Sequence, residues 1–367
     1  AWDHSRLADF ARFVDGPMPW SFDDYDALLR WSLDAPEAFW GALSDWAEIP
    51  WSVAPSRALR VDAMPGAVWF PGGRLNHAEL ALRQATRTPA ATAIVSVSQT
   101  RDRLELSWAE LADRVARCRL GLVKLGVGTG DCVVAYLPNI AETTIAFLAT
   151  SSLGAIWSSC APEFGVRAVT DRWSQVRPKV LLTVDGYRYG DKDVDRSRHV
   201  AEIVAGLPTL EHVVRLPYLD PNGEDGWLAL LDHEPSVASE AMTFEPVAFD
   251  HPLYVLFSSG TTGLPKPIVH CHGGITVEHV KALALHYDLG PGDRFCWFTT
   301  TGWMMWNFLT SAALVGATAV LFDGDPGSPD LSTLWSLAAR EHVDVLGVSA
   351  PFVMACRKAG LRPVDDH

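Results

Sequence analysis

The segment Tyr254–His270, with the sequence YVLFSSGTTGLPKPIVH, decides how the rest of the chain is interpreted. An apolar run typical of a strand leads into a loop of serine, glycine and threonine, and Lys266 follows between two prolines. Glycines let backbone N–H groups approach an anion closely, short hydroxyls add donors, and the lysine adds a point charge. The pattern predicts a triphosphate-binding loop, which we expect between a strand and a helix. Its candidate residues are Ser258, Ser259, Gly260, Thr261, Thr262, Gly263 and Lys266.

The spacing in this loop differs from that of other nucleotide-binding loops. Two residues separate Gly260 from Gly263, where a Walker loop has four, and Pro267 follows the lysine in place of Ser or Thr. A second glycine-rich segment, GVGTGD at Gly126–Asp131, follows a predicted helix and precedes a predicted strand. A dinucleotide-binding turn has the opposite order. We therefore interpret this second segment as a helix end and a turn.

Composition and charge narrow the class of protein. The chain has 367 residues, which is long for one hydrophobic core, so two or three packed subdomains are expected. Its net charge of -14 disfavours binding to a nucleic-acid backbone. The longest apolar run, Ala312–Phe322, is far shorter than the ~20 residues of a membrane span. We expect a protein that binds neither nucleic acid nor membranes, and the N-terminal residues show no secretory signal.

The six cysteines are scattered and include no CxxC pair. In a chain of this length they predict reduced thiols in the cytoplasm, most of them buried in the core. Cys271 lies between His270 and His272, which is a combination of metal-ligating residues. Three consecutive residues on a strand cannot all point to one side, so we expect no metal site there.

The order of the predicted elements indicates an α/β fold. Residues 1–90 are rich in Trp and Phe and predict a helical cap region, with two amphipathic helices separated at Pro36 and a helix start at Asn76. Residues 91–367 alternate apolar strands with helical segments, which predicts parallel sheets whose faces helices cover. Ser107 and Glu110 form a capping box at the start of the first of these helices.

Several segments resemble one enzyme family. The segment SSGTTGLPKPIVH is similar to the phosphate-binding signature of the acyl-adenylate-forming superfamily, which includes acyl-CoA synthetases, luciferases and peptide-synthetase adenylation domains. Most members have Gly after the lysine, whereas Pro267 and the following IVHCHGG resemble the acetoacetyl-CoA synthetase branch more closely. Further segments with this resemblance are WFPGGRLNHAEL, LSWAEL, GDCVVAYLPN, LGAIWSSCAPEFG, VTDRWSQVRPKVLLTVDGYRYGDK and TTTGWMMWNFL.

The resemblance implies substrates and roles for the matched residues. It implies ATP-dependent activation of acetoacetate and transfer to CoA, with Mg²⁺ offsetting the phosphate charge. The loop residues named above would hold the β- and γ-phosphates of ATP. Trp303, Met304, Met305 and Trp306 would line the acyl pocket, although aromatic and Met residues at helical spacing also suit a buried helix start. Arg188 and Lys192 would bind the 3′-phosphate of CoA, although a solvated surface turn explains them better.

Other motifs of the superfamily do not follow the phosphate loop. We find no Tyr-Gly-x-Thr-Glu motif after Pro267, no ribose-binding Asp and no distal catalytic lysine. We therefore expect the large N-terminal domain of such an enzyme, truncated at its C-terminus and inactive alone, and assign no catalytic residue within it. Two alternatives stay open: a synthetase for acetate, propionate or butyrate, and a non-catalytic protein that keeps only nucleotide binding.

Overall fold

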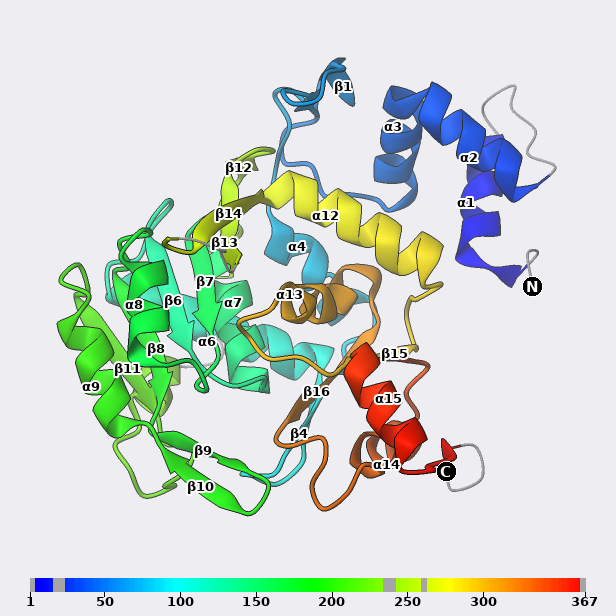
Figure 1. Cartoon of the computed structure of the whole chain (residues 1–367). Helices are drawn as coiled ribbons and strands as arrows, with labels where there is room; N and C mark the ends of the chain where they lie inside the picture. Colours follow the sequence, from blue (N-terminus) through cyan, green and yellow to red (C-terminus); the bar gives the residue numbers. More distant parts are fainter. Residues whose placement is uncertain (1–3, 16–23, 234–241, 259–262, 364–367) are drawn as a thin grey trace.

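Two sheets of mostly parallel strands form the body of the molecule (Figure 1). The computed structural model describes residues 4–15, 24–233, 242–258 and 263–363. The six-stranded sheet has the order β11-β8-β6-β7-β13-β14, and the five-stranded sheet has the order β17-β15-β16-β4-β5. In each sheet only the strand named last runs antiparallel to its neighbour. The α/β fold with parallel sheets is as predicted from the sequence.

The strands of the six-stranded sheet are β6 (Cys132–Tyr136), β7 (Ile156–Cys160), β8 (Val180–Val184), β11 (His212–Leu216), β13 (Pro252–Ser258) and β14 (Lys266–Cys271). The five-stranded sheet contains β4 (Thr92–Ser98), β5 (Leu104–Ser107), β15 (Arg294–Trp297), β16 (Thr318–Asp323) and β17 (Val345–Gly347). Three two-stranded pairs accompany them: β1 (Leu59–Val61) with β2 (Val68–Trp69), β3 (Arg74–Leu75) with β12 (Val247–Ala248), and β9 (Gly186–Tyr189) with β10 (Lys192–Asp195).

Helices α6 (Trp108–Lys124) and α7 (Ala141–Ser152) lie between the two sheets. Helix α6 packs on β4, β5 and α7, whereas α7 packs on β7 and β4. Every residue of α7 except Glu142 is buried. A helix that is buried on all sides belongs to the interior of a layered protein.

Alternate strand residues face different cores, because side chains on a strand point to opposite faces in turn. On β6, Val133 and Ala135 face the central core, while Val134 and Tyr136 join an outer cluster. Helices α8 (Val166–Trp173) and α9 (Ser197–Ala205) complete that outer cluster. Helices α14 (Thr333–Arg340) and α15 (Ala350–Lys358) cover the outer face of the five-stranded sheet. The molecule is therefore layered as helices, sheet, helices, sheet and helices.

Three N-terminal helices lie beside a long helix in the upper right of Figure 1, and the first and third of them pack on it. They are α1 (Arg6–Asp15), α2 (Tyr25–Asp34) and α3 (Pro36–Trp46), and the break at Pro36 is as predicted. The long helix consists of α12 (His272–Val280) and the π-helical segment η2 (Lys281–His286). The backbone N–H of Arg6 donates to Asp288 at 2.7 Å. The division of the chain at residue 90 stays a prediction.

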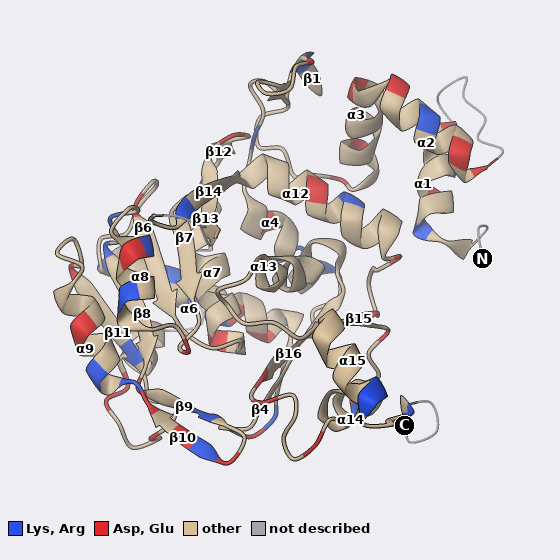
Figure 2. Cartoon of the chain, viewed as in Figure 1, with Lys and Arg blue, Asp and Glu red and all other residues tan. Residues whose placement is uncertain are grey.

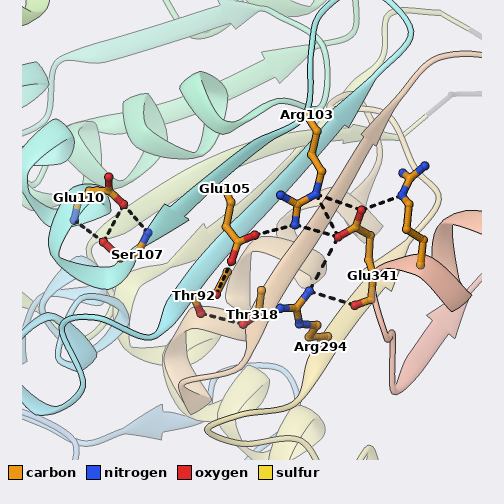
Figure 3. A network of polar contacts seen from close by, with 9 residues as sticks. Thr92, Arg103, Glu105, Ser107, Glu110, Arg294, Thr318 and Glu341 are labelled. Carbon is orange, nitrogen blue, oxygen red and sulfur yellow. Dashed lines mark hydrogen bonds and ion pairs between the residues drawn. The ribbon is translucent and has the colours of Figure 1, made fainter.

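The remaining helices are short. They are α4 (His77–Ala81), α5 (Gln84–Arg87), α10 (Gly226–Leu231), α13 (Met304–Thr310) and the 3₁₀ segment η3 (Ser311–Val315). Asn76 caps α4 by accepting from the backbone N–H of Ala78, as its position predicted. The capping box of Ser107 and Glu110 at α6 is also present, with both reciprocal bonds formed (Figure 3).

One prediction about the phosphate loop was wrong. The loop joins two antiparallel strands, β13 and β14, and does not lead directly into a helix. Pro267 lies within β14 and has no backbone N–H to donate. In a central strand this would remove a hydrogen bond between strands, but β14 is an edge strand and tolerates the proline. The prolines weakened the strand pattern in the sequence. His270, Cys271 and His272 are likewise not all on one strand, because β14 ends at Cys271 and α12 begins at His272.

A buried carboxylate ties the five-stranded sheet together (Figure 3). Glu341, at the end of α14, is 3% exposed and pairs with Arg103 at 2.9 Å, Arg340 at 3.0 Å and Arg294 at 3.8 Å. Because a buried charge is costly without partners, these arginines account for its burial. Glu341 thereby joins the strands β5 and β15 to the outer helix layer.

Buried neutral histidines make the stability of this fold sensitive to acid. Burial lowers the pKa of His77 to about 3, and the pKa of His279 is also lowered to about 3 by burial. His77 contacts Thr276 at 3.0 Å and His279 contacts Ser311 at 2.7 Å. In the unfolded chain both rings titrate near pH 6.5. Their contribution to stability is complete above that pH and is lost as the pH falls towards 3.

We predict that His279→Gln reduces this acid sensitivity, because glutamine can bond Ser311 without titrating. Between pH 6 and pH 5 the free energy of unfolding should fall by ~1 kcal/mol less in the variant than in the parent chain. Urea unfolding at several pH values measures this slope. The control variant His4→Gln changes an exposed histidine and should leave the slope unchanged. Equal slopes for His279→Gln and the parent chain would contradict the prediction.

Candidate functional site

The phosphate loop lies at the carboxyl end of β13, beside the edge strand β14. Ser258 and Lys266 are opposite each other in the register of the two strands. The side chain of Lys266 is exposed, and Gly263 has φ +95°, a left-handed conformation that favours glycine. Ser259, Gly260, Thr261 and Thr262 lie outside the described residues. The described part of the loop thus places the exposed ammonium group of Lys266 at the edge of the sheet. The phosphate-binding roles of the loop residues stay predictions.

A cavity of about 400 Å³ lies where the carboxyl ends of strands from both sheets meet. Ligands of open α/β sheets bind at the carboxyl ends of the strands. Asn139 follows β6, Glu163 follows β7, and Thr300 follows β15. The lining also includes Tyr187, Tyr189, Lys192, Val194, Phe298, Thr299, Phe322, Asp323 and Gly324.

Asp323, the last residue of β16, is buried in this cavity wall. Its carboxylate accepts from the hydroxyl of Tyr218 at 2.7 Å, and Tyr218 contacts Ser98 at 2.5 Å. Burial raises the pKa of Asp323 to about 7. The guanidinium of Arg101 lies 4.4 Å from the ring centre of Tyr218 and pairs with Glu142 at 2.7 Å. These contacts connect the ends of β4, β11 and β16 with the start of α7.

Gln99 holds the β9–β10 hairpin against the five-stranded sheet. Its oxygen accepts from the N–H groups of Gly190 at 2.9 Å and Asp325 at 2.8 Å. Its nitrogen donates to the carbonyls of Asp325 at 3.0 Å and Ser328 at 3.1 Å. Thr100 accepts from the N–H of Arg188 at 2.9 Å. All bonds that one amide side chain readily makes are used, so Gln99 fixes the hairpin tip beside the cavity.

The hairpin carries both candidate residues for CoA, but in different surroundings. Figure 2 shows basic and acidic residues close together on β9 and β10. Arg188 pairs with Asp193 through two contacts, at 2.7 Å and 3.4 Å. Lys192 lines the cavity, and no ion pair of Lys192 occurs among the described residues. Of the two, Lys192 is the better placed to receive a phosphate.

The four candidate acyl-pocket residues differ in how far their side chains are exposed. Trp303 is 64% exposed and Met304 is 48% exposed at the start of α13. Met305 is half-buried. Trp306 is fully buried, stacks on Trp157 with ring centres 6.2 Å apart, and contacts Phe147 at its edge. The packing of Trp306 supports the alternative that it is a core residue, whereas Trp303 and Met304 are accessible.

A larger groove, of about 900 Å³, lies elsewhere, between α5 and α6. Three alanines of α6 and the side chains of Met242 and Phe244 form much of its wall. Glu48 at its rim is paired with Arg87 at 2.6 Å and with Arg83 at 3.7 Å. The groove is not at the strand ends and its arginines are already neutralised, so we do not assign the site to it.

Sequence reasoning missed Asn139, Gln99, Tyr218 and Asp323. All four are polar residues that end or follow an apolar strand, as in CVVAYLPN and TAVLFDG. Because carboxyl ends of parallel strands meet at one edge, this signal was available. The sequence did not show that two separate sheets would bring these strand ends together.

Comparison with known proteins gives one consistent result. Residues 82–366 match the family model of AMP-binding enzymes, and residues 25–81 match that of the acetyl-coenzyme A synthetase N-terminus. The chain is 40% identical to an acetoacetyl-coenzyme A synthetase of Rhizobium meliloti, over 100% of this chain and 56% of the relative. It is 36% identical to an acetoacetyl-CoA synthetase of Xenopus tropicalis, over 99% of this chain and 56% of the relative.

A solved structure agrees with these relatives. Acetoacetyl-CoA synthetase from Streptomyces lividans is 48% identical, with a TM-score of 0.94 over 100% of this chain and 56% of that chain. The chain therefore spans little more than half the length of the proteins it matches.

We predict that Gln99→Leu loosens the hairpin, because it removes one hydrogen bond to the tip at Gly190 and three to the adjoining segment at Asp325 and Ser328. Loss of ~1.4 kcal/mol of local stability corresponds to about tenfold faster amide hydrogen exchange. Exchange should accelerate at Gly190 and Asp325 and stay unchanged at Val134 in the sheet interior. Thr100→Val, which removes one bond to the hairpin, should affect Arg188 alone. Unchanged exchange at Gly190 in Gln99→Leu would refute the role of this residue.

Proposed function

The chain belongs to the AMP-binding enzyme family, and on this premise we propose that the whole protein converts acetoacetate to acetoacetyl-CoA with ATP and CoA. The observation that carries the proposal is the match of the entire chain to proteins named acetoacetyl-CoA synthetase. The phosphate loop between β13 and β14 supports it, because Lys266 is exposed and available to an anion.

The proposed reaction has two steps. A carboxylate oxygen of acetoacetate attacks the α-phosphorus of ATP, the bond to pyrophosphate breaks, and acetoacetyl-AMP forms. The thiol of CoA then attacks the acyl carbon and loses its proton, and the bond to AMP breaks. Neither step needs a nucleophilic side chain. Lys266 and the loop N–H and hydroxyl groups stabilise charge on the phosphoryl oxygens, which is the main contribution of the protein in phosphoryl chemistry.

Magnesium is proposed as a companion of ATP, not as an ion that this part of the chain binds. Among the residues that the structure describes, no cluster of three His, Cys, Asp or Glu side chains could hold a metal ion. The donor set that Mg²⁺ prefers, several oxygens, is supplied by the phosphates themselves.

The two remaining substrates are assigned to different elements. CoA approaches through the cavity at the strand ends, with Lys192 near its phosphate, because Arg188 is already paired with Asp193. The acyl chain lies beside Trp303, Met304 and Met305 at the start of α13, where side chains are accessible.

The cysteines and the helices bear on the cellular location. All six cysteines are unpaired, and five of them are buried. Unpaired cysteines are typical of a reducing compartment, which supports the proposed cytoplasmic location. In the described part of the chain, none of the helices has both the length and the apolar character needed to cross a membrane.

The acid that the protein activates is tested by comparing substrates. With the whole protein, kcat/KM should be highest for acetoacetate among acetoacetate, acetate, propionate and butyrate. The N-terminal match to acetyl-coenzyme A synthetases makes acetate the most informative competitor. A tenfold preference for any other acid would replace acetoacetate in the proposal. If the protein turns over none of the four acids, a nucleotide-binding protein without catalytic activity is favoured.

Lys266→Ala tests the phosphate loop. Removing a charge-assisted contact worth ~1.5–3 kcal/mol should lower the rate of acid-dependent ATP–pyrophosphate exchange by about 10- to 100-fold. Adenosine affinity should barely change, because the lysine contacts only phosphates. Lys358→Ala, at an exposed site on α15, is the matched control. Unchanged exchange in Lys266→Ala would show that the loop does not hold the phosphates.

A further inference from the structure

The amide side chain of Gln175 joins the outer helix α8 to the base of the phosphate loop. Gln175 lies two residues beyond the end of α8, and its Nε2 donates to the carbonyl of Pro265 at 3.0 Å. The same nitrogen donates to the carbonyl of Asp171, within α8, at 2.8 Å. An amide nitrogen carries two hydrogens to donate. One of them therefore holds the side chain on its own helix, and the other reaches the residue before Lys266.

Helix α8 is a fixed support for this bond. Val169 and Trp173 of α8 are fully buried in the outer cluster of the six-stranded sheet. Phe257 of β13 packs against the same cluster, and it is opposite Pro267 in the register of β13 and β14. A hydrogen bond between two elements costs little further conformational entropy once apolar packing has placed them. The core itself therefore holds the end of α8 within hydrogen-bonding distance of the loop.

The bond fixes the peptide group from which Lys266 projects. The carbonyl of Pro265 and the N–H of Lys266 belong to one planar peptide unit, so holding the oxygen limits rotation of the whole plane. The two prolines, at positions 265 and 267, have no N–H to donate. Because the backbone on both sides of Lys266 lacks these donors, strand pairing orients it less firmly, and the bond from Gln175 becomes more important for its orientation.

We propose that Gln175 is a positioning residue for phosphate binding, because it holds the Pro265–Lys266 peptide and so directs the ammonium group of Lys266. The inference rests on the proposed function, in which Lys266 contacts the phosphates of ATP. Gln175 acts through Lys266 and itself contacts no reactant. A cation that is held in place before the ligand arrives loses less conformational freedom on binding than a mobile one. Gln175 thereby favours binding of the triphosphate and has no part in binding the acid.

The test is a double-mutant cycle in the whole protein, with acid-dependent ATP–pyrophosphate exchange as the measurement. Gln175→Met keeps the length of the side chain without its donor, and Gln175→Ala is a second variant that lacks the donor. Each should raise the KM for ATP by about three- to tenfold and leave the KM for acetoacetate unchanged. In a Lys266→Ala background, Gln175→Met should have no further effect, because the group that it positions is absent. Ser174→Ala, at the exposed neighbouring position, is the matched control and should keep both KM values of wild type.

Each other outcome overturns the inference, and the outcomes differ in what they say of the proposed function. An equal loss from Gln175→Met with and without Lys266 shows that the glutamine acts independently of the lysine. Parallel rises in the KM values for ATP and acetoacetate, together with a lower urea midpoint of unfolding, show a general loosening of α8. Exchange that falls in Lys266→Ala but not in the Gln175 variants overturns this inference and leaves the proposed function in place. Unchanged exchange in Lys266→Ala overturns the phosphate-binding role of the lysine, and the role of Gln175 with it.

Discussion

The burial of α7 between the two sheets is the constraint on which the rest of the structure depends. Its side chains are mostly Ala, Ser and Thr, which are small enough for strands to pack on both sides. Glu142, its one residue that is not fully buried, pairs with Arg101 beyond β4. Because β6 leads into α7 through Asn139, the start of this helix is also where the strand ends of both sheets meet. The site follows from that layering.

Polar side chains turn this meeting of loops into a fixed geometry. Loops have no ladder of their own, so their backbone groups need other partners. The side chain of Gln99 bonds to two segments at once, at Gly190 and at Asp325 and Ser328. Asp185 accepts from the N–H groups of Tyr218, Leu219 and Asp220 at 2.7–2.8 Å. Burying Asp323 has a cost, which its bond to Tyr218 offsets in part. The side-chain bonds therefore fix the loops that lie between the strands of the cavity wall.

Much of this fold is readable from local sequence. Alternating apolar patterns, the caps at Asn76 and Ser107 and the break at Pro36 all act within a few residues, and the structure has them where they were expected. The β14 strand was missed because two prolines mask it, and an edge strand tolerates them. The cavity was missed because Asn139, Tyr218 and Asp323 are far apart in sequence. Their proximity depends on how two sheets pack across α7, and no local pattern encodes that distance.

The positions of charge suggest why the two halves of the proposed reaction use different elements. Lys266 stands on an edge strand in contact with solvent, where the triphosphate of the proposed reaction would keep part of its hydration. The cavity opens at the strand ends of both sheets, and its wall carries the carboxyl groups of Glu163 and Asp323 beside the cation of Lys192. CoA, a proposed substrate, carries its phosphates at one end and a neutral arm at the other and suits this wall, with Lys192 of β10 near its phosphates. Under the proposed function, the triphosphate is held by the loop between β13 and β14 and the thiol of CoA arrives from the strand-end cavity, so the layered core keeps these two ligands apart until they react.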